Sequence, residues 1–153
     1  MIRRTTLAIT LLGMLLPANP STAGKADIPP GWREGNNAKI LPKYCQDRLD
    51  KHGRWTKWRD YFGPVYVHMH HYCSGIYGEL MAQQTIDKKK REYWVRQAVS
   101  EMNYVSPHCD PSCVLYADLH RRLAWGLSQQ GRHEEATKHY QLMGAAKKSA
   151  RAP

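Results

Sequence analysis

Helix-forming periodicity is clearest in residues 65–80, and this stretch limits what the chain can fold into more than any other. Its apolar stripe recurs in steps of three and four residues and comprises Val65, Met69, Tyr72 or Cys73, Ile76 and Leu80. Such steps place side chains on one face of an α-helix. Gly75 and Gly78 interrupt the pattern, and each lowers helix propensity by about 1 kcal/mol relative to alanine. We therefore expect a central helix over residues 64–85, approached closely by another helix at the two glycines.

The same periodicity recurs along the rest of the chain, and no segment of the sequence alternates convincingly in the manner of a β-strand. We expect further helices over residues 42–51, 55–62, 89–105, 112–130 and 133–147. Glycine and proline mark the boundaries at Gly53, Gly63-Pro64, Ser106-Pro107 and Gly131. The sequence predicts an all-α fold of antiparallel helix pairs with short connections. Residues 42–148 would form one helical domain, preceded by an extended lead-in over residues 24–41.

A leader of 23 residues precedes these segments. Arg3 and Arg4 form a basic start, residues 7–16 form an apolar run, and Ser21-Thr22-Ala23 supplies small residues. This order is typical of a secretory signal peptide that is cleaved after its last small residue. The apolar run is about half the ~20 residues that a membrane-spanning helix needs. We expect residues 1–23 to be removed and the mature protein, without a membrane span, to be periplasmic or secreted.

The chain is basic, with 23 Lys and Arg residues, 13 Asp and Glu residues and a formal net charge of +10. Loss of Arg3 and Arg4 with the leader lowers the first number to 21 and the net charge to +8. Such a surface attracts anionic partners. For an exported protein we expect acidic protein, anionic polysaccharide or lipid head groups rather than nucleic acid. The basic run at residues 88–91 is a candidate anion contact, with a solvated helix face as the alternative.

Four cysteines lie in the mature part of the chain: Cys45, Cys73, Cys109 and Cys113. An even count in an oxidising compartment favours disulfides, and four cysteines allow three pairings. Asp110-Pro111-Ser112 is a turn-forming trio that can bring Cys109 and Cys113 together. The bond Cys45–Cys73 would then join an N-terminal segment to the central helix and close a loop of 27 intervening residues. In the chain-entropy model such a loop contributes roughly 3 kcal/mol.

The central stretch also concentrates side chains that can bind metals: His68, Met69, His70, His71 and Cys73. On a helix, His68 and His71 share a face, whereas His70 points elsewhere. His68 and His71, together with Met69, are therefore candidate ligands for copper or zinc. A third ligand would have to come from another segment, with His120 or His52 as candidates. The alternative is that His68 and His71 are hydrogen-bonded residues that line a groove between helices.

The C-terminal segment carries a spaced set of small and aromatic residues: Leu123, Ala124, Leu127, Gly131, Ala136 and Tyr140. A glycine, an alanine five residues later and an aromatic four residues after that resemble a tetratricopeptide repeat, a helix–turn–helix unit of 34 residues. The resemblance covers residues 116–148. This sequence departs from the family's pattern at His120, where the family often has tryptophan, and at Met143, where it usually has alanine.

Residues 65–105 resemble a second, diverged copy of this repeat. Tyr72 and Gly75 would stand in its first helix, and Ala98, Met102 and Val105 in its second. About eleven additional residues around 85–91 lengthen this copy. Two copies fall short of the three or more repeats that a stable solenoid usually needs. The helices expected at 42–51 and 55–62, held by the expected disulfide, would then serve as an N-terminal cap.

The resemblance implies a curved helical surface that binds peptides or proteins and carries no catalytic residues. A groove in that surface would be lined by Tyr66, His70, Tyr77, Tyr116, His120 and Arg121. The sequence contains no Gly-x-Ser-x-Gly elbow, no phosphate loop and no haem-attachment motif. We therefore expect a scaffold or adaptor module of the cell envelope that needs no cofactor. The alternative is a periplasmic copper- or zinc-binding protein that uses the histidine-rich helix.

Overall fold

The computed structural model describes residues 37–49 and 56–149; the expected signal peptide and residues 24–36 lie outside them. The described elements are η1 Asn37–Ile40, α1 Lys43–Leu49, α2 Thr56–Phe62, η2 Gly63–His68, α3 Met69–Gln84, α4 Lys88–Val105, η3 Ser106–His108, α5 Tyr116–Gln129 and α6 His133–Ser149. These described residues contain helices and no strand, so the all-α prediction is confirmed. The end of the expected extended lead-in is instead the 3-10 helix η1.

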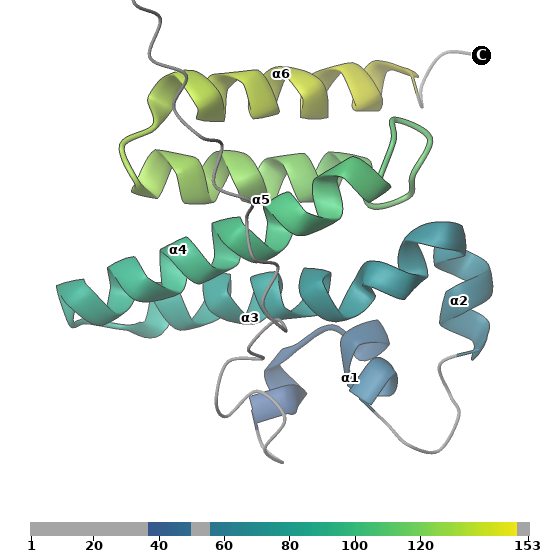
Figure 1. Cartoon of the computed structure of the whole chain (residues 1–153), viewed down its shortest axis with the longest axis horizontal. Coiled ribbons are helices and arrows are strands. Elements are labelled where there is room, and N and C mark those ends of the chain that lie inside the picture. Colours follow the sequence, from purple (N-terminus) through teal and green to yellow (C-terminus); the bar gives the residue numbers. More distant parts are fainter. Residues whose placement is uncertain (1–36, 50–55, 150–153) are drawn as a thin grey trace, which may run out of the picture.

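The four long helices α3, α4, α5 and α6 lie one beside the next in chain order (Figure 1). Short connections join α3 to α4 and α5 to α6, which makes each of these pairs antiparallel. Helix α1 lies on the side of α3 opposite α4, and α2 packs against η2, which precedes α3 (Figure 1). Paired packing of consecutive helices is therefore observed. The finer assignment to a tetratricopeptide solenoid stays a prediction.

Helix α3 is the central element of the core. Every residue from 71 to 79 is buried, because α4 packs along one side of the helix while α1 and α5 contact others. The two glycines face α4, as expected: a Cβ atom on Gly78 would lie 3.2 Å from the Cβ atom of Ala98. A Cβ atom on Gly75 would lie 2.5 Å from Cε of Met102. The glycines thus permit a helix contact that larger residues would prevent.

Some helices begin at other residues than expected, and local hydrogen bonds explain these differences. Asp87 caps α4, since its Oδ1 accepts a hydrogen bond from the Lys90 amide at 2.8 Å. A capping carboxylate offsets the unfavourable basic residues of the first turn. Helix α5 begins at Tyr116 rather than at residue 112, because Asp110 accepts hydrogen bonds from Ser112 and holds this segment in a turn. Gly131 ends the α5 segment with a φ of 74°, the left-handed conformation that favours glycine.

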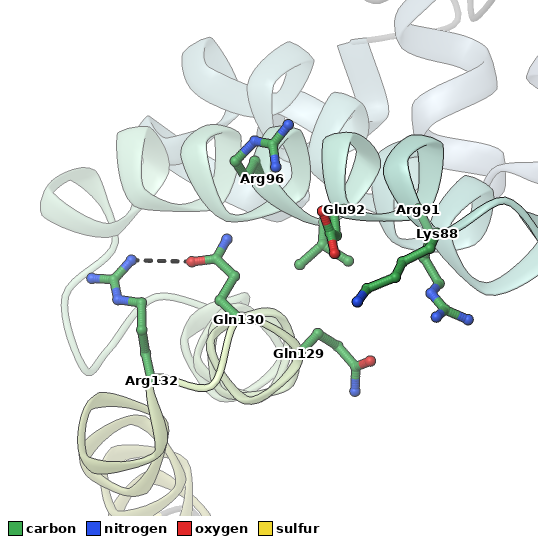
Figure 2. A pocket seen from close by; sticks show the side chains of 8 residues that line it. Lys88, Arg91, Glu92, Arg96, Gln129, Gln130 and Arg132 are labelled. Atoms are coloured by element: carbon green, nitrogen blue, oxygen red, sulfur yellow. Dashed lines mark hydrogen bonds between the residues drawn. The ribbon is translucent and has the colours of Figure 1, made fainter.

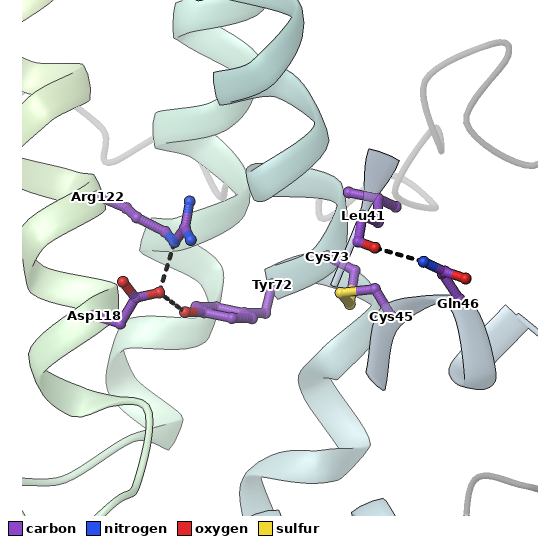
Figure 3. The surroundings of a disulfide bond; sticks show 7 residues. All are labelled: Leu41, Cys45, Gln46, Tyr72, Cys73, Asp118 and Arg122. Atoms are coloured by element: carbon purple, nitrogen blue, oxygen red, sulfur yellow. Dashed lines mark hydrogen bonds and ion pairs between the residues drawn. A yellow bond between two sulfur atoms is a disulfide. The ribbon is translucent and has the colours of Figure 1, made fainter. Parts of the chain in front are cut away.

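Both expected disulfides are present. Cys45 on α1 is bonded to Cys73 on α3, and both residues are fully buried (Figure 3). Cys109 and Cys113 are bonded across the turn that precedes α5. The described residues contain no free cysteine. The first bond joins α1 to α3. Helix α1 has 7 residues, fewer than an isolated helix needs to be stable, so this bond and its packing hold it in place.

Candidate functional site

The histidine-rich stretch lies where the start of α3 meets the end of α4. His71 is buried, and its Nδ1 atom lies 2.6 Å from Oε2 of Glu101 on α4. The imidazole also lies against the ring of Tyr104, with the two centroids 3.7 Å apart. His71 is therefore a hydrogen-bonded residue between two helices. This agrees with the alternative to a metal site, in which His71 forms a hydrogen bond at a helix contact.

His68 occupies the same side of the stack, beside His71. Its ring stacks on the ring of His108, with centroids 3.7 Å apart and planes inclined by 5°. Burial lowers the pKa of His68, and the neighbouring His108 and His71 lower it further. His70 instead contacts the backbone carbonyl oxygen of Val67 at 3.1 Å.

The stretch does not gather the ligands that a copper or zinc site there would need. Met69 is fully buried in the core, and Cys73 is committed to a disulfide. Of the proposed third ligands, His120 lies against α6, and His52 falls outside the described residues. No group of three or more His, Cys, Asp or Glu residues that could hold a metal ion occurs within residues 37–49 and 56–149.

Three of the six residues expected to line a partner-binding groove are buried instead: Tyr66, Tyr77 and His120 are 3%, 3% and 4% exposed. Each side chain meets a neighbouring helix. The guanidinium of Arg48 lies 5.1 Å from the ring centroid of Tyr66, and Tyr77 meets Trp94 edge to face at 5.7 Å. The prediction that these three side chains face a partner is therefore wrong, because helix packing uses them.

The other three residues of the expected groove are half-buried: His70, Tyr116 and Arg121. The edge of the Tyr116 ring meets the His120 ring, with centroids 4.3 Å apart. Arg121 pairs with Asp118 at 3.0 Å and lies 3.7 Å from Glu79. The structure does not bring the six residues together in one open groove.

Arg121 belongs to a polar network that joins α3 to α5. The Tyr72 hydroxyl donates a hydrogen bond to Asp118, and Arg122 pairs with Asp118 (Figure 3). Arg122 also pairs with Glu79 on α3. Burial raises the pKa of Tyr72, and the nearby Asp118 carboxylate raises it further. Burial alone would raise the pKa of Asp118, but Arg122 and the Tyr72 hydroxyl more than offset this and lower it. The polar groups of this network are paired with one another, so the network holds α3 against α5.

A hollow of the described surface lies between α4 and the end of α5. It has a volume of about 490 Å³ and is lined by Lys88, Arg91, Glu92, Val95, Arg96, Gln129, Gln130 and Arg132. We call this hollow the basic pocket. Figure 2 shows the side chains of Lys88 and Glu92 extending from α4 toward Gln129, with Arg132 hydrogen-bonded to Gln130.

The basic pocket carries an excess of positive charge. Arg132 is already paired with Glu135, through two contacts of 2.6 and 2.7 Å. Lys88, Arg91 and Arg96 are exposed, and none has an ion-pair partner among the residues that the structure describes. The lining holds one carboxylate, Glu92, against these three cations. Closely spaced cations without counter-charges attract anionic groups.

The sequence indicates part of the basic pocket. Lys88 and Arg91 belong to the basic run at residues 88–91, a candidate anion contact, and both line the pocket. No sequence motif points to the other polar lining residues: Arg96, Gln129, Gln130 and Arg132. The α5 residues lie more than thirty positions from Arg96 in the sequence. No local sequence motif can show that Arg96 lies near these residues, because only the packing of α4 against α5 brings them together.

A second cluster of polar side chains lies between α5 and α6. Nδ1 of His120 lies 2.8 Å from Nδ1 of His139, so one ring donates a hydrogen bond to the other. Burial lowers the pKa of His120 to about 4, and the neighbouring His139 contributes to this. Burial also lowers the pKa of His139. Both shifts favour the neutral form of the imidazole.

The fold and these sites define an all-α protein with two disulfides. No known protein-family model, curated protein or solved structure matches the chain. Within the described residues, no helix is both long enough and apolar enough to cross a membrane.

Proposed function

We propose that the protein is an exported interaction module that binds an acidic segment of a partner protein in the cell envelope, and that the basic pocket holds this segment. The observation that carries the proposal is the concentration of exposed cations around a hollow of about 490 Å³. Lys88, Arg91 and Arg96 line the hollow from one stretch of α4 and would supply the positive charge that attracts a carboxylate. Such contacts with arginine are charge-assisted and can be bidentate.

The remaining lining supports a peptide rather than a uniform polyanion as the ligand. Gln129 and Gln130 offer amide groups that can both donate and accept hydrogen bonds, as a peptide backbone requires. Val95 also lines the pocket, but it is 4% exposed, so cations and amides supply most of the surface that a ligand could contact. These groups fit an extended acidic segment, whose carboxylates would meet the cations and whose backbone would meet the amides.

Export is supported by the two disulfides, since such bonds persist in oxidising compartments. It is also supported by the order of basic, apolar and small residues in the first 23 positions. The antiparallel helix pairs and the tetratricopeptide resemblance of residues 116–148 support a role in binding a protein. The site that we propose differs from the groove expected from that resemblance, because the basic pocket is formed by α4 and the α5–α6 connection.

Peptide binding tests the proposal directly. Fluorescence anisotropy would measure the binding of a short labelled peptide of Glu and Leu residues, together with its Gln-for-Glu counterpart. We expect the Glu peptide to bind more tightly and its affinity to fall as salt rises toward 0.15 M, because screening weakens exposed charge contacts. Arg96→Glu should weaken binding about tenfold, which corresponds to about 1.4 kcal/mol.

Lys138→Glu is the matched control, because it makes the same change of charge on the exposed side of α6. This variant should bind almost as the unchanged protein does. Equal losses in the two variants would assign the binding to net charge instead of the basic pocket. Equal affinity for the Glu and Gln peptides would overturn the proposal, and tighter binding of an anionic polysaccharide would show that the proposed ligand class is wrong.

A further inference from the structure

The histidine pair between α5 and α6 is not used by the proposed function. His120 is 4% exposed, His139 is half-buried, and their Nδ1 atoms are 2.8 Å apart. In a hydrogen bond of this kind, the accepting nitrogen directs its lone pair at the other ring. Two nitrogen donors from two different helices thus converge on one point, and a shared proton occupies that point.

A sulfur ligand stands on the same side of α6. Met143 follows His139 by four residues, a spacing that places the two side chains on one face of a helix, and Met143 is half-buried. Thioether sulfur suits copper(I), and imidazole is a common copper ligand. His120 and Met143 are also the two positions at which residues 116–148 depart from the tetratricopeptide pattern. The chain thus has a histidine and a methionine where the pattern has residues that bind no metal.

We propose that His120, His139 and Met143 bind one copper(I) ion between α5 and α6, with the ion taking the place of the proton between the two rings. The ring that carries this proton on Nδ1 loses it to water and takes up a proton on Nε2, so both imidazoles stay neutral and each offers an Nδ1 lone pair to the ion. In a three-coordinate site, metal–nitrogen bonds near 2 Å place the two nitrogens about 3.5 Å apart, an opening of about 0.7 Å from the present contact of 2.8 Å. Helix α6 is the last of the stack and packs chiefly against α5 (Figure 1). A small outward shift of α6 therefore disturbs few other contacts.

The surroundings favour copper(I) over zinc. Structural zinc sites take four ligands in a tetrahedron, and no group of three His, Cys, Asp or Glu residues that could hold a metal occurs in the described part of the chain. Glu135 precedes His139 by one helical turn, but its carboxylate is paired with Arg132. Copper(I) accepts fewer ligands than zinc and prefers the softer donor set that two imidazoles and a thioether supply.

Competition with a coloured copper(I) chelator, under anaerobic and reducing conditions, tests the site. We expect one copper(I) ion per chain, and roughly 100-fold or greater weakening of affinity in His139→Ala. His139 is half-buried on the terminal helix, so this variant should fold, and helical circular dichroism would verify that it does. His70→Ala is the matched control: it removes another half-buried imidazole, and copper affinity should not change.

X-ray absorption at the copper edge supplies a second readout. The spectrum should show nitrogen neighbours and one sulfur neighbour, and Met143→Leu should remove the sulfur while the helices stay intact. Absence of copper binding would overturn the proposal. Binding that persists in His139→Ala and disappears in His68→Ala or His71→Ala would also overturn it, since the ion would then lie between α3 and α4. The copper site and the basic pocket share no residue, so failure of one proposal leaves the other standing.

Discussion

A Cβ atom on Gly126 would lie 2.4 Å from Cγ2 of Val99, so α5 and α4 meet at a point where the larger helix residues do not fit. Valine has one strongly preferred side-chain rotamer in a helix and cannot easily turn away. The contact contributes to the packing of α4 against α5, which joins the two helix pairs and also forms the basic pocket.

Replacement of this glycine should therefore destabilise the protein, although alanine is the better helix former. We expect Gly126→Ala to lower the free energy of unfolding by about 1–3 kcal/mol, the usual cost of overpacking. Gly144→Ala is the matched control, because its added Cβ would have no atom within 4 Å apart from the neighbouring residues and backbone of its own helix. It should raise stability by up to about 1 kcal/mol through helix propensity alone. Urea unfolding followed by circular dichroism compares the two, and changes of the same sign would contradict the account.

The two disulfides should differ in what their loss costs. Replacing Cys45 and Cys73 together by alanine should lower the free energy of unfolding by roughly 3 kcal/mol, because the bond spans 28 residues of sequence. Replacing Cys109 and Cys113 together should cost about 2 kcal/mol, because that bond spans 4. Chemical denaturation of both double variants would measure the difference. A larger loss for the second pair would contradict the chain-entropy explanation.

The fold could be predicted largely from the sequence because its signals are local. Apolar residues at helical spacing located α3 to α6, and the Asp110-Pro111-Ser112 turn indicated which cysteines pair nearby. The exact start of α5 could not be predicted, since hydrogen bonds from Ser112 to Asp110 hold the chain in a turn before Tyr116.

The candidate sites were much harder to predict. Helical-face reasoning tells which way Tyr77 and His120 point, but not that Trp94 and His139 pack against them. Both side chains are therefore buried where an open groove was expected. The basic pocket depends on α4 and α5 lying side by side, and this is a property of helix packing instead of any sequence motif.

His71 and Glu101 should couple strongly, because both are buried and lie 2.6 Å apart. A double-mutant cycle with His71→Ala and Glu101→Ala should give a coupling free energy of about 1–3 kcal/mol. Loss of Glu101 alone should cost about 3 kcal/mol, since the buried imidazole loses its partner. The exposed pair Arg132–Glu135 is the control, and its coupling should be much weaker, because solvent screens exposed ion pairs. Similar coupling in both pairs would refute the importance of burial.

Asp118 should make stability depend on pH in a defined range. Tyr72 and Arg122 hold the pKa of its carboxyl below the ordinary value in the folded state. The stability that Asp118 contributes is therefore complete above the unfolded pKa of about 3.9, and it is lost as pH falls through the lower folded pKa. Asp118→Asn should lower the free energy of unfolding at pH 7 by about 2 kcal/mol, because the mostly buried Arg122 loses a charged partner.

The difference between Asp118→Asn and the unchanged protein should shrink as pH falls below about 4, since protonation then removes the same charge that the substitution removes. Urea unfolding at a series of pH values from 7 downward would measure it. Asp60→Asn is the control: this carboxyl is 74% exposed, so the variant should stay within about 0.5 kcal/mol of the unchanged protein throughout. A difference for Asp118→Asn that is constant with pH would mean that packing, and not its charge, accounts for the contribution of Asp118 to the α3–α5 contact.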